Sequence, residues 1–377
     1  CNMAFSPVCD ILYNWQNTEV VNRAFGNDPE RVAKMSAAYV KGAHENPGFA
    51  CAAKHFPGNG QDFRDAHLSN NVNYFDVEEW DKTYGLVYKT LIENDLDAIM
   101  AGHIMLPKYA KAINPDLKDE DMMPATLSPE IMQGLLRDKL GFNGMVVTDA
   151  SHMVGMTDRM KRKDMLPRTI NAGCDMFLFF NDPEEDFTTM LEAYKNGTIS
   201  EERMEEALER ILGLKAHLGL HKKAKEELVP APEALDGVLG SQEHKDMQKA
   251  ISRDSITLVK YKDKEVLPVT PKRYKRIMIV HVKGAESGMS ALAKAMGMAG
   301  GTNPAELLRD KLISKGFDAF IYESPVDKMK KQIEAGEKPD INIYFAGKNA
   351  IADFVKDMDL VITLCDVNEG RPSFGLS

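Results

Sequence analysis

The chain has 377 residues, more than twice the roughly 150 residues of a typical domain, so we expect two domains. Hydrophobic residues make up 44% and charged residues 28% of the chain, a composition that is typical of globular proteins and excludes the disordered, collagenous and coiled-coil classes. With 47 Lys and Arg against 57 Asp and Glu, the net charge of -10 argues against nucleic acid or an anionic membrane as the partner and favours a small or neutral molecule.

The first half of the chain predicts a series of buried parallel strands. Short unbroken apolar runs that end in polar residues suit strands covered on both faces, and they occupy residues 3–10, 49–55, 98–103, 145–149 and 174–180. Helical patterns lie between them at 28–43, 76–94 and 128–140, each opening with N-terminal capping signals. The repeated order of strand and helix predicts parallel βαβ units, either in a doubly wound sheet or in a (β/α)8 barrel.

Polar residues at the predicted strand ends favour the barrel. Asp10, the pair Lys54 and His55, His103 and Asp149 each follow a different strand. In a (β/α)8 barrel the carboxyl ends of all strands converge on one mouth, whereas a doubly wound sheet uses mainly one switch point. No glycine-rich nucleotide-binding motif follows any of these strands, which argues against a nucleotide ligand.

The pattern restarts in the second half of the chain. A helix over 200–220 closes the first region, and the charged stretch after it carries two prolines, as linkers often do. Further elements follow: a helix at 244–252, strands at 256–260, 277–282, 318–322 and 360–364, and a helix after Asn303. We therefore expect a TIM-type (β/α)8 barrel over residues 1–222, a linker over 223–239 and a smaller α/β sandwich domain over 240–377.

Neither a metal site nor a transmembrane helix is expected. The five cysteines form no CxxC pair, which also argues against a disulfide framework, and no run of about 18 apolar residues exists. The sequence begins CNMAFSP, without an initiator Met or the regions of a signal peptide. Localisation stays undetermined: the cytoplasm is favoured, and a secreted or lipid-anchored form is the alternative because mature lipoproteins can begin with Cys.

The strongest chemical motif is the segment 54–67, KHFPGNGQDFRDAH. Gly58 and Gly60 allow a tight or mobile loop after the strand. Asp65 and His67 stand two residues apart on this loop, and a carboxylate beside an imidazole fixes its tautomer and raises its basicity, as general acid-base catalysis requires. A single loop histidine is more often a surface residue, but four titratable residues clustered with two glycines favour the chemical interpretation.

A second motif is the segment 142–153, FNGMVVTDASHM. An Asp that ends a buried apolar strand costs desolvation free energy unless it is paired or functional. Asp149 is therefore a candidate nucleophile at the barrel mouth, and the alternative is a cap of the following helix. His152, at the expected helix start, is more suited to packing.

These segments together resemble glycoside hydrolase family 3, in its β-N-acetylglucosaminidase branch. KHFPGNG followed by DAH is similar to the loop signature KHFPGHG…DSH of that family, and VVTDASHM to its nucleophile strand. SPVCDI and NRAFGNDPERV resemble the preceding strand and the segment that bears a sugar-binding Arg. NAGCDMFLF resembles a later barrel strand, and SRDSITLVK the opening of the second domain. The resemblance covers most of residues 2–282.

The resemblance implies a retaining, exo-acting β-N-acetylhexosaminidase that acts on a carbohydrate with terminal β-linked GlcNAc and uses no cofactor. It implies that Asp149 is the catalytic nucleophile and that His67, supported by Asp65, is the acid-base group. This branch departs from the two-carboxylate arrangement of most retaining glycosidases.

The resemblance also implies a set of sugar-binding residues. Arg23, Lys54 and His55 would bind the sugar hydroxyls, with Asp10 and His103 as further candidates. Asp10 could equally be a structural residue at a strand end, and His103 could equally be a satisfied core histidine. The oligomeric state stays undetermined.

Other functions remain as alternatives. A β-glucosidase or β-xylosidase of the same family is disfavoured because those branches usually lack the loop Asp-x-His. A GlcNAc phosphorylase is possible chemically, since an imidazole repels an anionic acceptor less than a carboxylate does. A catalytically silent sugar-binding barrel is disfavoured because binding alone needs neither a nucleophile nor a proton shuttle.

The sequence departs from the family pattern in two ways. Asn59, Gln61 and Ala66 replace the usual His, Asp and Ser, which changes the hydrogen bonding expected within the loop. Only five strong barrel strands are recognisable, and by resemblance the chain starts after the first strands and ends inside the second domain. We therefore expect a barrel that is incomplete at its N-terminus and a second domain that is incomplete at its C-terminus.

Overall fold

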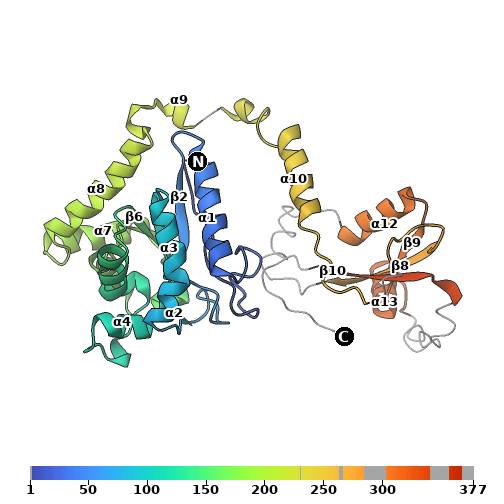
Figure 1. Cartoon of the computed structure of the whole chain (residues 1–377), viewed down its shortest axis with the longest axis horizontal. Helices are drawn as coiled ribbons and strands as arrows, with labels where there is room; N and C mark the ends of the chain where they lie inside the picture. The colour runs from blue at the N-terminus through green and yellow to red at the C-terminus, as the bar shows by residue number, and fades with distance from the viewer. Residues whose placement is uncertain (1, 230, 263–265, 284–302, 340–355, 367–377) are drawn as a thin grey trace. The chain divides into compact units, whose positions relative to one another are not determined.

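The chain divides into two compact units, Cys1–Leu239 and Gly240–Ser377 (Figure 1). A computed structural model describes residues 2–229, 231–262, 266–283, 303–339 and 356–366. Each unit contains its own parallel β-sheet, which confirms the α/β class. Among the helices described, none combines the length and the apolar character needed to cross a membrane.

The first unit is built on a curled, five-stranded parallel sheet in the order β1-β2-β4-β6-β7. Spatial order follows chain order, as successive right-handed βαβ crossovers require. The short strands β3 and β5 form a separate parallel pair. The sheet is an open half-barrel in the part of the chain described, so closure into eight strands stays a prediction. The strand bounds are β1 Met3–Ala4, β2 Ala50–Phe56, β3 Asn71–Val72, β4 Ala98–Ala101, β5 Ile104–Met105, β6 Met145–Ala150 and β7 Met176–Leu178.

Helices pack against this sheet, and two of them begin directly after the aspartates that the capping signals predict, Asp28 and Asp76. Asp28 caps α1 by accepting a hydrogen bond from the backbone N–H of Arg31. The helix bounds are α1 Pro29–His44, α2 Val77–Lys82, α3 Tyr84–Glu93, α4 Pro107–Ile113, a π-helix over Glu130–Lys139, α5 Val154–Thr157, α6 Arg162–Ala172, α7 Pro183–Lys195, α8 Glu201–His217 and α9 Lys225–Leu228.

The prediction of a single helix over 76–94 is wrong in one respect. The structure divides this segment at Thr83 into two helices, α2 and α3. The hydroxyl of Thr83 donates a hydrogen bond of 2.7 Å to the carbonyl oxygen of Glu79, which competes with the regular helical pattern. The break turns α3 so that Tyr84 and Tyr88 enter the core.

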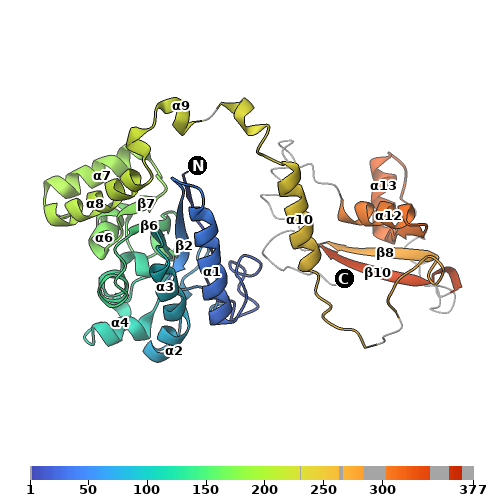
Figure 2. The ribbon, with the colours of Figure 1, turned by 45° about the horizontal axis from the view of Figure 1, so that its top comes forward.

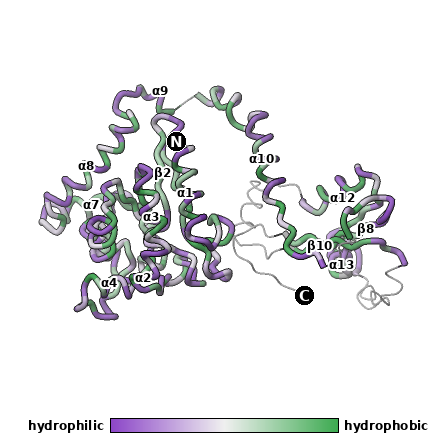
Figure 3. The backbone as a smooth tube through the Cα atoms, in the orientation of Figure 1, coloured by the Kyte–Doolittle hydropathy of each residue, from purple (hydrophilic) through white to green (hydrophobic). Residues whose placement is uncertain are grey.

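An aromatic core fixes the sheet to its outer helices. Helices α1 and α3 lie side by side against β2 (Figures 1 and 2). Phe56 of β2 meets the edge of Tyr88 at 5.0 Å, and Trp80 meets Tyr109 at 5.2 Å, geometries that favour aromatic pairs. In Figure 3 purple and green alternate along helix α8, as expected of a helix with one face on the core, whereas the upper part of β2 is pale green, in keeping with a buried strand. This packing makes the strand ends rigid supports for functional side chains.

A buried ion cluster fixes the amino-terminal side of β7. Asp175 precedes that strand and pairs with Arg203 at 2.7 Å and with Arg137 at 3.1 Å. Its carboxylate also accepts a hydrogen bond of 2.8 Å from the backbone N–H of Val146 in β6. The cluster therefore ties two adjacent strands to the helices behind them.

The second unit contains a three-stranded parallel sheet in the order β10-β8-β9. Helix α12 packs against β9 and β8. The last residues of the first unit form short helical turns, α9 and a 3-10 turn at Pro232–Leu235, within the range expected to be a linker. The bounds are α10 Gln242–Asp254, β8 Arg276–Lys283, α12 Pro304–Ser314, β9 Asp318–Ile321, α13 Pro325–Glu334 and β10 Leu360–Asp366.

The strand predicted over 256–260 is wrong. The structure shows no strand there, and Ile256, Leu258 and Val259 are exposed. An apolar alternation forms a strand only where a neighbouring strand accepts its backbone hydrogen bonds, and no described strand lies beside this segment.

Candidate active site

Asp149 lies at the carboxyl end of β6, where the sequence places it. Its side chain is 19% exposed, and its Oδ1 accepts a hydrogen bond of 2.8 Å from the N–H of Ala150. Burial alone would raise the pKa of Asp149, but the charges of His55 and His103 and the Ala150 N–H outweigh burial and lower it. Asp149 is therefore ionised at neutral pH, the state that a nucleophile requires.

His55 stands between two carboxylates. Its Nδ1 lies 2.7 Å from Oδ2 of Asp10, and its Nε2 lies 3.7 Å from Oδ2 of Asp149. Burial opposes the charged form, but the charge and hydrogen bond of Asp10, followed by Asp149 and Glu19, raise the pKa of His55. The bond to Asp10 fixes the proton on Nδ1 and orients Nε2 toward Asp149. Asp10 is thus a buried partner of His55 rather than a bare strand end.

Asp65 and His67 form the pair that the loop motif predicts. Oδ1 of Asp65 lies 2.7 Å from Nδ1 of His67 and also accepts a hydrogen bond of 2.9 Å from the His67 N–H. The hydrogen bond from Asp65 is the main reason that the pKa of His67 is raised, against a partial burial that lowers it. The His67 side chain is 51% exposed, so it can reach a substrate from solvent.

The loop that carries this pair needs its glycines. Gly58 and Gly60 have φ values of 120° and 104°, which side chains other than glycine rarely adopt. A Cβ on Gly60 would lie 2.1 Å from the carbonyl oxygen of Ile11, and one on Gly58 would lie 2.1 Å from the ring of Tyr84. The backbone therefore passes so close to its neighbours that only glycine fits.

The structure brings Lys54 and Arg23 to one cavity of about 370 Å³. Burial lowers the pKa of Lys54, while the charge of Asp149 opposes that effect, which places Lys54 within the field of the nucleophile candidate. Arg23 donates a hydrogen bond of 2.6 Å from Nε to the carbonyl oxygen of Glu19. Both cations can donate to sugar hydroxyls from this position.

His103 is buried, and protein groups engage both of its ring nitrogens. Nδ1 lies 3.0 Å from the hydroxyl of Thr126, and Nε2 lies 2.9 Å from the carbonyl oxygen of Ala150. Burial lowers the pKa of His103. These contacts favour the alternative of a satisfied core histidine, one that holds the carboxyl end of β6 beside Asp149.

Sequence reasoning missed Glu19 and Arg162. Glu19 has a side chain only 4% exposed and lies 3.5 Å from the ring of His67. Arg162 ties the loop after β6 to helix α7 through Ser151, at 3.1 Å, and Asp186, at 2.6 Å. No local spacing signals either residue, because their partners lie on other segments of the chain.

One group of described residues has the spacing of a three-ligand metal site. Glu19, Asp65 and His67 each offer a ligand atom, and these atoms lie within 4.8 Å of one another. The hydrogen bond between Asp65 and His67 already accounts for most of this proximity. The acid-base interpretation needs no ion at this position.

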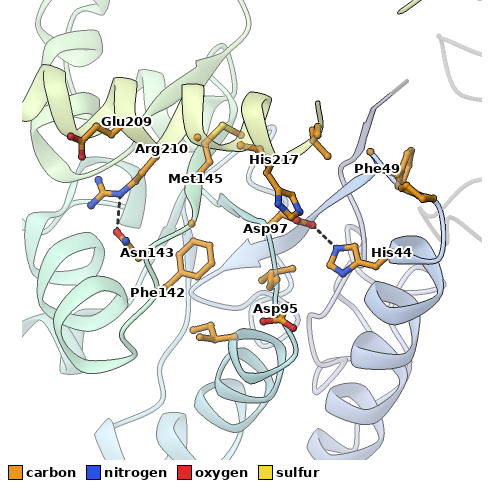
Figure 4. Close-up of a pocket in the computed structure, with 18 of the residues that line it drawn as sticks. His44, Phe49, Asp95, Asp97, Phe142, Asn143, Met145, Glu209, Arg210 and His217 are labelled. Carbon is orange, nitrogen blue, oxygen red and sulfur yellow. Dashed lines mark hydrogen bonds and ion pairs between the residues drawn. The ribbon is translucent and has the colours of Figure 1, made fainter. Parts of the chain in front are cut away.

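A larger cavity, of about 1020 Å³, lies at the opposite, amino-terminal ends of the strands (Figure 4). His44 and Asp97 form a pair at 2.7 Å in its wall, and Arg210 donates to Asn143. Asp97 also accepts a hydrogen bond of 2.8 Å from the N–H of Cys51. These contacts join structural elements, and none of the predicted catalytic residues lines this cavity.

Comparisons with known proteins identify the family of this chain. Residues 1–214 match the glycosyl hydrolase family 3 N terminal domain. The chain belongs to this family. It is 42% identical over 322 residues to a beta-N-acetylglucosaminidase/beta-glucosidase of Cellulomonas fimi, covering 85% of this chain and 55% of that protein. It is 29% identical over 270 residues to beta-hexosaminidase A of Pseudoalteromonas piscicida, covering 69% of this chain and 44% of that protein.

Solved structures of the family share its fold. A structure titled beta-glucoside phosphorylase BglX bound to 2FGlc has a TM-score of 0.84 and 35% identity, over 100% of this chain and 62% of the other. A family 3 beta-N-acetylglucosaminidase from Paenibacillus has a TM-score of 0.73 at 23% identity, over 97% of this chain and 62% of the other. The chain thus spans about half to two thirds of the length of these relatives.

Proposed function

We propose that this family 3 chain carries the active site of a retaining, exo-acting β-N-acetylhexosaminidase that releases terminal β-linked GlcNAc. The observation that carries the proposal is the pairing of an ionised Asp149 at a strand end with an Asp65–His67 pair on the adjacent loop. The charge of Asp149 contributes to the raised pKa of His67, which supports the proposal that the two groups belong to one site.

The proposed reaction has two steps that share one histidine. Asp149 attacks the anomeric carbon and forms a glycosyl ester, while protonated His67 gives its proton to the departing glycosidic oxygen. Neutral His67 then takes a proton from water, which attacks the ester, releases the sugar and restores the Asp149 carboxylate. Asp65 keeps the His67 ring oriented and basic throughout.

Substrate binding is proposed for the residues that flank the nucleophile. Arg23, Lys54 and His55 donate to the sugar hydroxyls, and Asp10 supports His55 from behind. The relative from Cellulomonas fimi is named for action on both glucosides and N-acetylglucosaminides. A β-glucoside is therefore the second candidate substrate, and the loop Asp-x-His favours the acetamido sugar.

We also propose that the half-barrel is part of a larger architecture. Residues 1–222, with their five parallel strands, contribute part of a (β/α)8 barrel, and a linker over 223–239 and an α/β sandwich domain over 240–377 follow it. The active site would then lie at the carboxyl-terminal mouth of the barrel, where barrel enzymes place their catalytic residues.

Phosphorolysis is a second candidate activity, favoured by the 35% identity to a structure titled as a phosphorylase. Arg23 and Lys54 line one cavity, and the charge of Lys54 acts on Asp149, which favours binding of an anionic acceptor beside the nucleophile. In this variant inorganic phosphate replaces water in the second step and the product is a sugar 1-phosphate.

The deciding experiment compares nitrophenyl β-GlcNAc with nitrophenyl β-glucoside, using the full-length protein with and without inorganic phosphate. We expect higher kcat/KM for the GlcNAc glycoside and free GlcNAc as the product. A slow fluorinated glycoside should label the peptide that contains Asp149. A label on another carboxylate, or higher kcat/KM for the glucoside, would contradict the proposal, and a sugar 1-phosphate would establish phosphorolysis.

A further inference from the structure

Glu19 is the buried carboxylate that links the two halves of the candidate site. It lies in the segment before Arg23, far in sequence from the strand of His55 and from the loop of His67, yet its charge acts on both histidines. Burial raises the pKa of Glu19, while the charge of His55 is the main opposing influence. A buried carboxylate whose charge acts on two imidazoles needs a role, since desolvation alone disfavours it.

The anchoring of Glu19 is specific. Its Oε2 accepts hydrogen bonds from Nδ2 of Asn59 at 2.7 Å and from the N–H of Ala66 at 3.3 Å. The oxygen of Asn59 accepts from Asn17 at 3.0 Å and from Asn71 at 3.1 Å. Those two donors fix the orientation of the Asn59 amide, so its nitrogen must face Glu19.

This anchoring aims the other oxygen of Glu19 at the acid-base histidine. Oε1 lies 3.5 Å from Nδ1 of His67, the same ring nitrogen that Asp65 contacts at 2.7 Å. Both carboxylates therefore favour a proton on Nδ1 and a cationic ring, and Nε2 remains the nitrogen for proton exchange with substrate.

A continuous set of contacts connects this histidine to the nucleophile. The N–H of Asn59 donates to Asp10 at 2.8 Å, Asp10 holds His55 at 2.7 Å, and His55 faces Asp149 at 3.7 Å. The Asn59 amide joins this set to Glu19.

We propose that Glu19 is a positioning residue for His67: its carboxylate, held by Asn59 and Ala66, fixes the catalytic loop and supports the cationic form of the acid-base ring. The inference rests on the proposed function, because it assumes that His67 transfers the proton. The charged and titratable groups that act on His67 are Asp65, Glu19, Asp149 and His103. Glu19 is the buried member of this set that Asn59 holds in place.

The test is the pH dependence of Glu19→Gln in the full-length protein. Gln keeps the size of the side chain and an oxygen for Asn59 but removes the charge. Because protonated His67 is the active acid, we expect the alkaline limb of kcat/KM to move down by about one pH unit. At pH values above the limb the kcat/KM for chitobiose should fall by up to about tenfold, and that for nitrophenyl β-GlcNAc by less than about twofold.

The control is Glu93→Gln, at an exposed position on α3. This change should leave kcat/KM for both substrates and the alkaline limb of its pH profile unchanged. Glu19→Asp keeps the charge but shortens its reach, so an intermediate shift of the limb is expected. It also carries the test if Glu19→Gln does not fold. The pKa of His67 itself is followed by NMR of labelled histidine, with His67→Ala assigning the signal.

The outcomes separate the two proposals. An unchanged alkaline limb and an unchanged His67 pKa in a folded, active variant would overturn the role of Glu19. Equal losses for chitobiose and the nitrophenyl glycoside would reduce Glu19 to a structural residue. Absence of activity in the unmodified protein toward every glycoside would instead refute the proposed function.

Discussion

Replacing His67 by Ala tests the proposed chemistry most directly. The side chain is half exposed and its main contact is one charge-assisted hydrogen bond to Asp65, so we expect a stability change of about 1 kcal/mol or less. Loss of general acid-base catalysis costs about 10²- to 10⁴-fold in rate, or about 3 to 5 kcal/mol in activation free energy. The effect on catalysis should thus greatly exceed the effect on folding.

The assay measures kcat/KM across aryl β-GlcNAc glycosides of increasing leaving-group pKa, together with chitobiose. For chitobiose and for glycosides with poor leaving groups, kcat/KM should fall by the full factor expected for loss of acid-base catalysis, because their oxygens leave only when protonated. A nitrophenolate departs without that proton, so its kcat/KM should be largely retained while its kcat falls, since the ester now waits for unactivated water. Azide, which needs no base, should restore kcat.

The matched control is His221→Ala, at an exposed position outside the site, which should behave as the unmodified protein. A uniform loss across all leaving groups in His67→Ala would refute the reasoning. His67 would then be a binding group, and the acid-base residue would have to be found elsewhere.

Four further predictions follow from the same contacts. Asp65→Asn should lower the pKa of His67 and move the alkaline limb of kcat/KM down by about one pH unit, because the raised pKa depends first on that carboxylate; an unmoved limb would assign the raised pKa to other groups. Asp175→Ala should lower the free energy of unfolding in urea by about 3 to 5 kcal/mol, because it removes the buried carboxylate that pairs with Arg203 and Arg137. Gly60→Ala should lower the free energy of unfolding by about 1 to 3 kcal/mol and displace the loop. Gly42→Ala on α1, where a Cβ meets no atom within 4 Å, should leave the free energy of unfolding unchanged or raise it. EDTA should leave kcat/KM unchanged, and a loss that zinc restores would make the three-ligand group a functional metal site.

Local features of the sequence predict much of this site. Asp149 ends an apolar run, and β6 places it at the carboxyl end of a buried strand. Asp65 and His67 are two residues apart, so their pairing depends on one turn of backbone and is visible in the sequence. The positions of β2, β4, β6 and α1 follow for the same reason, since hydrophobic periodicity and capping are short-range signals.

Prediction from the local sequence pattern fails where a structural element depends on a pairing strand or a hydrogen bond that the pattern does not show. The strand expected over 256–260 has the right residues, but no neighbouring strand is there to pair with its backbone. The break at Thr83 depends on a side-chain hydrogen bond that the helical pattern does not reveal.

Only the tertiary structure decides which charged groups meet. Asp10 pairs with His55 across 45 residues of sequence because a parallel bridge sets Val8 beside Lys54. Glu19 reaches His67 only because that register also brings the loop at Asn59 against the segment after Asp10. The sequence determined the residue types and the local loop, but pKa values depend on distances of a few ångströms between segments, and those distances are fixed by strand register and packing.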